Sequence, residues 1–324
     1  MKVNRREFLE RTAATLAALS VSGFSCITNK QGGMPFRTLG KTGLKVSLLS
    51  LGGYNIGIKE LLSGKEAIHL MRMAIDEGIN FFDNAWEYHD GRSEEWMGKA
   101  LQDGYRDKVV LMTKHHGREP KRAQQHLEDS LKRLKTDVID VWQFHELDEE
   151  KEVDDIYSSG VLDFALKAKE EGKVRFIGFT GHFRPSIHLD MINRGFAWDT
   201  IQMPLNVLDH YFESFTNQVL PVAVKKGIGV IGMKSLAGTP GVILENNIAT
   251  VEECLRFAMT LPVSTVCSGM DSLKVLKENT QIAKNFKPMT QDEIQILLAK
   301  TKESAKDGKY EEYKTYDPDP EDDW

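Results

Sequence analysis

The chain has 324 residues, of which 41% are hydrophobic and 28% are charged, a composition typical of a globular protein. Its net charge is −6 and no basic stripe is present, which argues against nucleic acid as a partner. The three cysteines, Cys26, Cys254 and Cys267, form no CxxC pair, so the sequence suggests neither a disulfide framework nor a zinc site.

Residues 1–33 differ from the rest and are predicted to be an export signal and a linker. Arg5 and Arg6 form a twin arginine followed by Phe-Leu and by a weakly apolar stretch, 12–24, that is too short for a comfortable transmembrane helix. This pattern is typical of a twin-arginine signal, so we expect a periplasmic or otherwise exported protein that meets the twin-arginine export machinery. An accidental Arg-Arg before a short amphipathic helix is the alternative. Cys26 follows a poor lipobox match, so lipid anchoring is not expected.

The remainder of the chain alternates between short apolar runs and amphipathic segments. Residues 34–46 predict a β-hairpin around a Gly-Lys-Thr-Gly turn. The strands expected after it are 47–51, 79–82, 108–113, 138–144, 174–179, 200–203, 228–232 and 264–267. The helices expected are 66–77, 93–102, 120–134, 160–171, 186–193, 213–226, 250–260, 273–283 and about 290–304, with an acidic loop at 148–155. The acidic tail from Tyr316 is expected to be solvated.

Eight strand–helix units favour one closed (β/α)8 TIM barrel over residues 34–324, with an N-terminal β-hairpin and an extra C-terminal helix. A doubly wound open sheet is the alternative. That fold usually has fewer strands and a glycine-rich first turn, and no GxGxxG motif opens a helix here. We expect the hairpin to plug the N-terminal mouth of the barrel. Functional residues should then lie at the opposite mouth, where the strands end.

Four ionisable residues follow the ends of consecutive strands. Asp83 ends the second strand, Tyr88 lies five residues later, and Lys114 and His145 end the next two strands. A nearby ammonium lowers the pKa of a phenol, so Lys114 is expected to tune Tyr88 while Asp83 holds Lys114 in an ion pair. His145 is expected to donate a hydrogen bond to a substrate oxygen. Such a site suits carbonyl reduction, in which negative charge develops on an oxygen. The sequence shows no activated Ser or Cys nucleophile and no evident cluster of metal ligands.

These residues belong to a set of segments that together resemble the aldo-keto reductase family. The segments are Asp83…Tyr88, Gly91-Arg92-Ser93-Glu94, Thr113-Lys114, Gln143-Phe144-His145, Ile177-Gly178-Phe179-Thr180, Gln202-Met203-Pro204-Leu205-Asn206 and Glu278-Asn279. The resemblance implies NADP or NAD bound across the C-terminal mouth, with direct hydride transfer to an aldehyde, ketone or sugar-derived carbonyl. It implies that Tyr88 is the general acid, that Lys114 and Asp83 support it, and that His145 orients the carbonyl.

The resemblance also implies which residues contact the cofactor. They are Thr180, Gln202, Met233, Ser268, Gly269, Asp271, Glu278 and Asn279. Gln202 would hold the nicotinamide carboxamide, and Glu278 and Asn279 would face the adenine end.

Three positions depart from the family pattern. Thr180-Gly181-His182 replaces the usual Ser-Asn, Met233 replaces an aromatic residue, and Asp271 stands where a basic residue often meets the 2′-phosphate of NADP. A carboxylate repels a phosphate and accepts from a ribose hydroxyl, so we expect the chain to tolerate or prefer NAD. Lys274, close by, argues against this expectation.

Three further residues are expected to shape the substrate pocket, namely Trp86 and His89, which flank Tyr88, and His182. Each candidate residue alone has an ordinary structural explanation. The order Asp, Tyr, Lys, His on successive strand ends is what favours catalysis. His69, His126 and His188 fall on helices and are expected at the surface, whereas Cys254 and Cys267 are expected to be buried small apolar residues.

Two other functions stay open at this point. One is a regulatory subunit that binds the cofactor and turns over little. The other is an epimerase or lyase that oxidises a sugar transiently with a tightly held dinucleotide. Export bears on this choice, because the periplasm has no obvious supply of dinucleotide to exchange with the protein.

Overall fold

The computed structural model describes residues 30–238 and 241–315. The predicted export signal, Cys26 and the acidic tail from Tyr316 lie outside the described residues. Within them, every helix is too short or too polar to cross a membrane.

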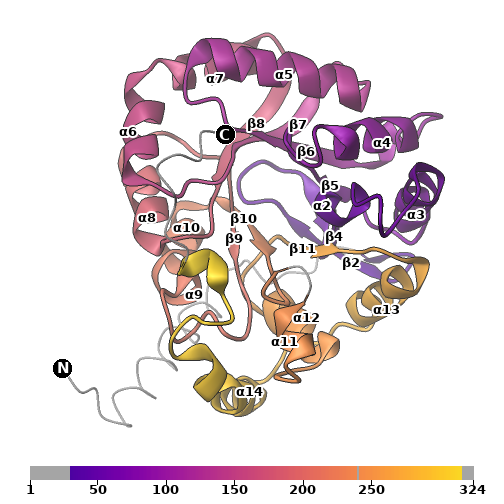
Figure 1. Ribbon diagram of the computed structural model, residues 1–324, viewed down its shortest axis with the longest axis vertical. Coiled ribbons are helices and arrows are strands. Elements are labelled where there is room, and N and C mark those ends of the chain that lie inside the picture. Colours follow the sequence, from indigo (N-terminus) through magenta and orange to yellow (C-terminus); the bar gives the residue numbers. More distant parts are fainter. Residues whose placement is uncertain (1–29, 239–240, 316–324) are drawn as a thin grey trace.

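Eight parallel strands close into a barrel, which confirms the predicted fold class (Figure 1). The strands are β4 (Leu49–Gly52), β5 (Phe81–Asp83), β6 (Val110–His115), β7 (Ile139–Phe144), β8 (Val174–Thr180), β9 (Thr200–Pro204), β10 (Gly229–Met233) and β11 (Thr265–Gly269). Successive strands are neighbours in the barrel, and β11 pairs with β4 to close it. Their residues are almost all buried, since helices cover the outer face and side chains fill the interior.

Helices surround the strands in the order that the sequence predicts. The longer ones are α3 (Gly64–Asp76), α4 (Arg92–Ala100), α5 (Pro120–Leu134), α6 (Glu150–Ser158), α7 (Val161–Glu170), α8 (Pro185–Asn193), α10 (Leu220–Lys226), α12 (Val251–Thr260), α13 (Leu273–Lys284) and α14 (Gln291–Ala305). Shorter turns are α2 (Gly53–Ile56), α9 (Phe215–Gln218), α11 (Val242–Glu245) and the 3₁₀ segments η1 (Arg106–Lys108) and η2 (Glu312–Lys314). Ser63, Thr250 and Thr290 open α3, α12 and α14 with capping boxes, which satisfy the free N–H groups of the first turn.

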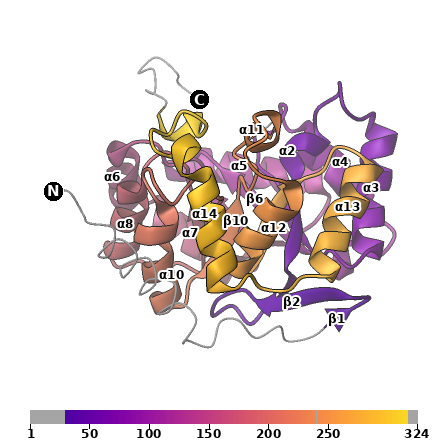
Figure 2. The same cartoon turned by 90° about the horizontal axis from the view of Figure 1, so that it is seen from below.

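The predicted hairpin plugs the N-terminal end of the barrel. Strands β1 (Lys30–Gln31), β2 (Met34–Thr38) and β3 (Lys45–Ser47) form a small antiparallel sheet at the edge of the molecule opposite η2 (Figure 2). Leu39 and Val46 pack into the barrel interior against Phe81 and Val110. This end is therefore closed by apolar packing, which leaves the C-terminal mouth for chemistry.

Two sequence expectations are wrong. The acidic stretch 148–155 is not a loop, because α6 starts at Glu150. Its charges stabilise the start of the helix, with Glu149 and Glu152 forming a capping box, and Val153 and Ile156 bury one face. His126 and His188 are not at the surface, since the two side chains are 3% and 0% exposed.

Candidate active site

The four strand-end residues converge at one mouth. Asp83 ends β5 and Lys114 lies on the adjacent β6, both almost completely buried. Lys114 Nζ lies 2.5 Å from Asp83 Oδ1, and it donates to Tyr88 Oη at 3.1 Å and to the backbone oxygen of Asn84 at 2.8 Å. Residues from β5, from the loop after it and from β6 thus form one continuous set of contacts around a single buried ammonium.

The second carboxylate oxygen of Asp83 accepts hydrogen bonds from residues on two more strands, β9 and β11. Asp83 Oδ2 accepts from Gln202 Nε2 at 3.0 Å and from Cys267 Sγ at 3.0 Å. Cys267 is buried as expected, but it is more than a small apolar residue because its thiol helps to hold the carboxylate. Gln202 Oε1 is buried and has no hydrogen-bond partner among the described residues.

The pKa of Tyr88 is raised well above its usual value, mainly by burial and then by the negative charges of Asp83 and Glu87. The net lowering of this pKa that the sequence led us to expect is therefore not found. Burial disfavours a phenolate, and burial and the two carboxylates together outweigh the ammonium of Lys114. Tyr88 stays protonated at neutral pH. Lys114 is a pure donor and occupies a lone pair of the phenol oxygen, so the phenol proton is directed elsewhere.

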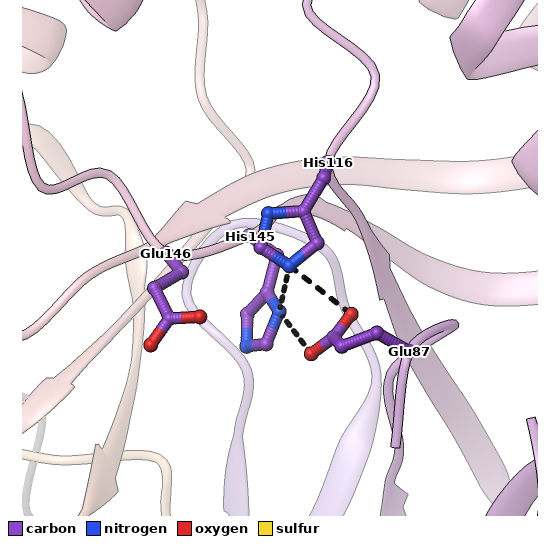
Figure 3. Close-up of side chains that lie close together, drawn as sticks. All are labelled: Glu87, His116, His145 and Glu146. Carbon is purple, nitrogen blue, oxygen red and sulfur yellow. Dashed lines mark hydrogen bonds and ion pairs between the residues drawn. The ribbon is translucent and has the colours of Figure 1, made fainter. Parts of the chain in front are cut away.

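His145 contacts two groups that the sequence did not single out as its partners. Its Nδ1 lies 2.7 Å from Glu87 Oε1 and 3.2 Å from His116 Nε2 (Figure 3). Burial lowers the pKa of His145, and Glu87 only partly opposes this, so the imidazole is neutral at pH 7. Burial alone would raise the pKa of Glu87, but contacts with His145 and His116 outweigh it and hold the carboxyl ionised. No spacing rule could reveal Glu87, because it meets His145 only through the closure of the barrel.

The residues flanking Tyr88 point in different directions. His89 contacts α2, where its Nε2 lies 2.8 Å from the backbone oxygen of Tyr54, and the Tyr54 ring meets the Tyr88 ring edge-on at 5.3 Å. Trp86 instead turns toward α5, where it stacks on His126 at 3.7 Å between ring centroids. This placement lends no support to Trp86 as a pocket residue.

A second polar group forms the other side of the mouth. His182 Nε2 lies 2.7 Å from Glu146 Oε1, and its ring meets Tyr313 edge-on at 5.7 Å. Lys234 Nζ lies 4.9 Å from the centroid of the Tyr313 ring. Tyr313 comes from the C-terminal segment, which the sequence analysis did not assign to the site. Buried contacts hold that segment in place, since Lys314 Nζ pairs with Asp209 Oδ1 at 2.7 Å.

The expected cofactor contacts lie around the same mouth. Thr180 and Gln202 are paired across β8 and β9 and are both 1% exposed, and Met233 ends β10. Ser268 ends β11 with an exposed Gly269, and its Oγ accepts from Asn279 Nδ2 at 3.2 Å.

Asp271 and Glu278 lie toward the solvent around the start of α13. Asp271 precedes this helix and is partly exposed, whereas Glu278 lies on it and is exposed. Glu278 Oε1 lies 3.9 Å from Lys274 Nζ, which is itself exposed.

The residues present fit a dinucleotide. Ser272 caps α13, whose first turn carries no acidic residue, so its backbone N–H groups suit a phosphate beside Ser268 and Gly269. At the other end of the site, the unpartnered oxygen of Gln202 suits an amide donor such as a carboxamide.

Comparison with known proteins agrees with this geometry. The aldo/keto reductase family model matches residues 48–248. The uncharacterized oxidoreductase YrpG of Bacillus subtilis is 34% identical over 243 residues, which cover 67% of this chain and 72% of YrpG. L-galactose dehydrogenase of Arabidopsis thaliana is 33% identical over 218 residues, which cover 62% of this chain and 65% of that enzyme. Among solved structures, the holo form of aldo-keto reductase AKR11C1 from Bacillus halodurans matches with a TM-score of 0.70 and 25% identity, over 82% of this chain and 96% of that one.

Proposed function

The chain belongs to the aldo/keto reductase family of oxidoreductases, and we propose that it reduces an aldehyde, ketone or sugar-derived carbonyl with Tyr88 as the proton donor. The observation that carries this proposal is the placement of Lys114 Nζ between Asp83 and Tyr88. The phenol, which burial keeps neutral, therefore lies at the mouth of the barrel with an ammonium behind its oxygen.

Each of the four candidate catalytic residues has a defined part in the proposed reaction. Tyr88 gives its proton to the carbonyl oxygen as negative charge develops there. Lys114 stabilises the phenolate that remains, and Asp83 holds Lys114 in place by an ion pair. His145 lies beside Tyr88, with the ring centroids 5.7 Å apart, where it positions the carbonyl oxygen.

Reduced NADP or NAD, when bound, would supply the hydride. Thr180 and Gln202 would hold its nicotinamide end, beside Met233. Ser268, Gly269 and Asn279, at the start of α13, would hold its phosphate and adenine end. Because Gln202 already donates to Asp83, its free oxygen is the atom offered to the carboxamide.

Asp271 favours NAD over NADP in this proposal. Its carboxylate precedes α13, where it repels a 2′-phosphate, and the nearby Lys274 is 82% exposed and loosely paired with Glu278. Asp271→Asn should therefore tighten NADPH binding while changing NADH binding little. Fluorescence titration of both cofactors checks this, and wild-type protein that binds NADPH much more tightly than NADH would contradict it.

The second polar group supports a sugar-derived carbonyl among the candidate substrates. Glu146, His182, Lys234 and Tyr313 line the mouth with hydrogen-bonding groups, which suit hydroxyls better than an apolar tail. The similarity to L-galactose dehydrogenase points the same way. His182 and His89 are the predicted pocket residues that we retain.

We also propose that the protein is exported by the twin-arginine route. The motif lies outside the described residues, so the proposal rests on Arg5 and Arg6 in the sequence. Replacing both arginines with lysine should leave the precursor in the cytoplasm. Equal amounts of mature wild-type and variant protein in the periplasm would contradict export by the twin-arginine route.

The function is tested on purified protein with a panel of aldehydes, ketones and sugars and with added NADH or NADPH. Absorbance of the reduced nicotinamide should fall with at least one carbonyl. A cofactor that stays bound after purification and is never consumed would favour the regulatory subunit or the epimerase instead. Absence of both turnover and cofactor binding would refute the proposed function altogether.

A further inference from the structure

Three side chains from three different loops meet beside the proposed proton donor. Glu87 follows β5, His116 follows β6 and His145 follows β7 (Figure 3). The distances are 2.7 Å from Glu87 Oε1 to His145 Nδ1, 3.2 Å from Glu87 Oε2 to His116 Nε2, and 3.2 Å between the two ring nitrogens. We call these three residues the His-His-Glu cluster.

We propose that the His-His-Glu cluster binds a divalent transition-metal ion such as Zn²⁺. Two imidazole nitrogens and a carboxylate are a ligand set that zinc and its neighbours accept. Ligand atoms bound to one zinc ion at about 2.0–2.1 Å in a tetrahedron are about 3.3 Å apart, close to the two 3.2 Å separations found here. The 2.7 Å separation involves the other carboxylate oxygen, Glu87 Oε1, so Glu87 would bind the ion through Oε2 alone or through both oxygens.

The way these atoms face one another supports a shared ligand. Glu87 Oε2 is buried and makes no aligned hydrogen bond, although His116 Nε2 lies 3.2 Å away. The two ring nitrogens also face each other across 3.2 Å. A common ion would accept a lone pair from each of these atoms at once.

The charged side chains nearest the His-His-Glu cluster are paired with partners outside it. Asp83 takes up the ammonium of Lys114, and Glu152 pairs with the guanidinium of Arg118 at 2.6 Å. One oxygen of Glu146 and one ligand atom from each cluster residue all lie within 4.8 Å of one another. Glu146 also pairs with His182. The fourth coordination position therefore falls to Glu146 or to water, as in zinc sites with three protein ligands.

Metal binding would fix the tautomer of His145. A neutral imidazole carries one N–H, and Nδ1 beside Glu87 would hold it if the carboxylate were its only partner. Nε2, which points away from Glu87 and His116 in Figure 3, would then be an acceptor and could not donate to a carbonyl oxygen. An ion on Nδ1 moves the proton to Nε2 and makes it a donor. This consequence for carbonyl reduction rests on the proposed function, whereas the metal site itself does not.

The test is calorimetric titration of Zn²⁺ into chelator-stripped, full-length protein. We expect one site per chain, and Glu87→Gln and His116→Asn should each weaken binding more than about 100-fold, because loss of an outer partner alone costs about 10–100-fold. His69→Asn, at an exposed histidine on α3, is the matched control and should bind as the wild type does. Thermal unfolding without metal verifies that each variant is folded. If Glu87→Gln does not fold, the binding measured with His116→Asn alone is enough for the test.

Absence of binding, or equal binding by the wild type and both cluster variants, would overturn the metal site. The proposal would also fail if Glu146→Gln and His182→Asn lost binding while the two cluster variants kept it. That result would place the ion in the neighbouring group of Glu146, Asp148 and His182. The titration needs neither carbonyl nor cofactor, so its outcome is independent of the proposed function. If both proposals hold, chelation should lower kcat/KM in the wild type, Zn²⁺ should restore it, and His116→Asn should not respond.

Discussion

The buried ion pair between Asp83 and Lys114 is the residue-scale feature on which the site depends. The two side chains are 6% and 1% exposed, and their charged atoms are 2.5 Å apart. Water cannot replace either partner at this depth, so each charge is tolerated only because the other is present. Tyr88 keeps its proton beside this pair mainly because it is buried, and the negative charge of Asp83 adds to that effect.

This arrangement predicts strong coupling between the two residues. Asp83→Asn should lower the free energy of unfolding by about 3–5 kcal/mol, because it leaves the Lys114 ammonium buried without a counter-charge. The double variant Asp83→Asn/Lys114→Met should be more stable than Asp83→Asn alone. Urea unfolding of the single and double variants measures this, and strictly additive losses would contradict it.

At the element scale, the C-terminal segment is held against the loop after β9 by a buried cluster. Lys314 Nζ contacts Asp209 Oδ1 at 2.7 Å and Glu311 Oε1 at 3.1 Å, with the three side chains at most 1% exposed. Burial raises the pKa of Glu311, and Lys314 opposes this. The cluster positions Tyr313 beside His182.

Lys314→Met should therefore loosen this segment. We expect a loss of about 3–5 kcal/mol in unfolding free energy and faster hydrogen exchange in residues 206–212 and 311–315, because two carboxyl groups lose their counter-ion. Lys306→Met is the matched control, since Lys306 is exposed and its pair with Glu303 should contribute less than about 1 kcal/mol. Similar losses of unfolding free energy in the two variants would show that the buried cluster stabilises the protein no more than an exposed ion pair does.

The sequence predicts elements well where one local pattern determines them. Apolar runs locate all eight barrel strands, and turn chemistry locates the hairpin. The acidic start of α6 is missed because charge suggests solvent, whereas the carboxylates cap the helix. The four-residue helices α2 and α11 are missed because they are too short to show a period, whereas α9 and α10 together occupy the single helix predicted at 213–226.

The site is predictable only in part, for a physical reason. Strand ends place Asp83, Tyr88, Lys114 and His145 at one mouth, so their meeting follows from the barrel. Glu87 and Tyr313 reach the same mouth through loop geometry, which leaves no period or spacing in the chain. The pKa direction of Tyr88 depends on burial depth, which only the packed structure supplies.

At the scale of the whole molecule, buried neutral histidines couple folding to pH. His188 is 0% exposed, and burial lowers its pKa from 6.5 to about 3. The unfolded chain therefore binds more protons than the folded chain between pH 6.5 and about 3, so stability falls as the pH drops through that window.

The expected loss due to His188 is about 2 kcal/mol between pH 7 and pH 5. His188→Gln, which retains a side-chain donor near the backbone oxygen of Gln202, should reduce the pH dependence by that amount. His69→Gln, at an exposed position, should leave it unchanged. Urea unfolding at the two pH values checks this, and equal slopes in all three proteins would rule out His188 as a source.

The most direct test of the whole account compares the kcat of Tyr88→Phe with that of Tyr54→Phe on a carbonyl that the wild type reduces. The two rings are 5.3 Å apart, so the variants remove one hydroxyl each from neighbouring positions. Tyr88→Phe should lose about 10²–10⁴-fold in kcat while binding reduced cofactor as the wild type does. Tyr54→Phe should retain most of its activity. Full turnover by Tyr88→Phe, or equal losses in both variants, would contradict the assignment of Tyr88 as the proton donor.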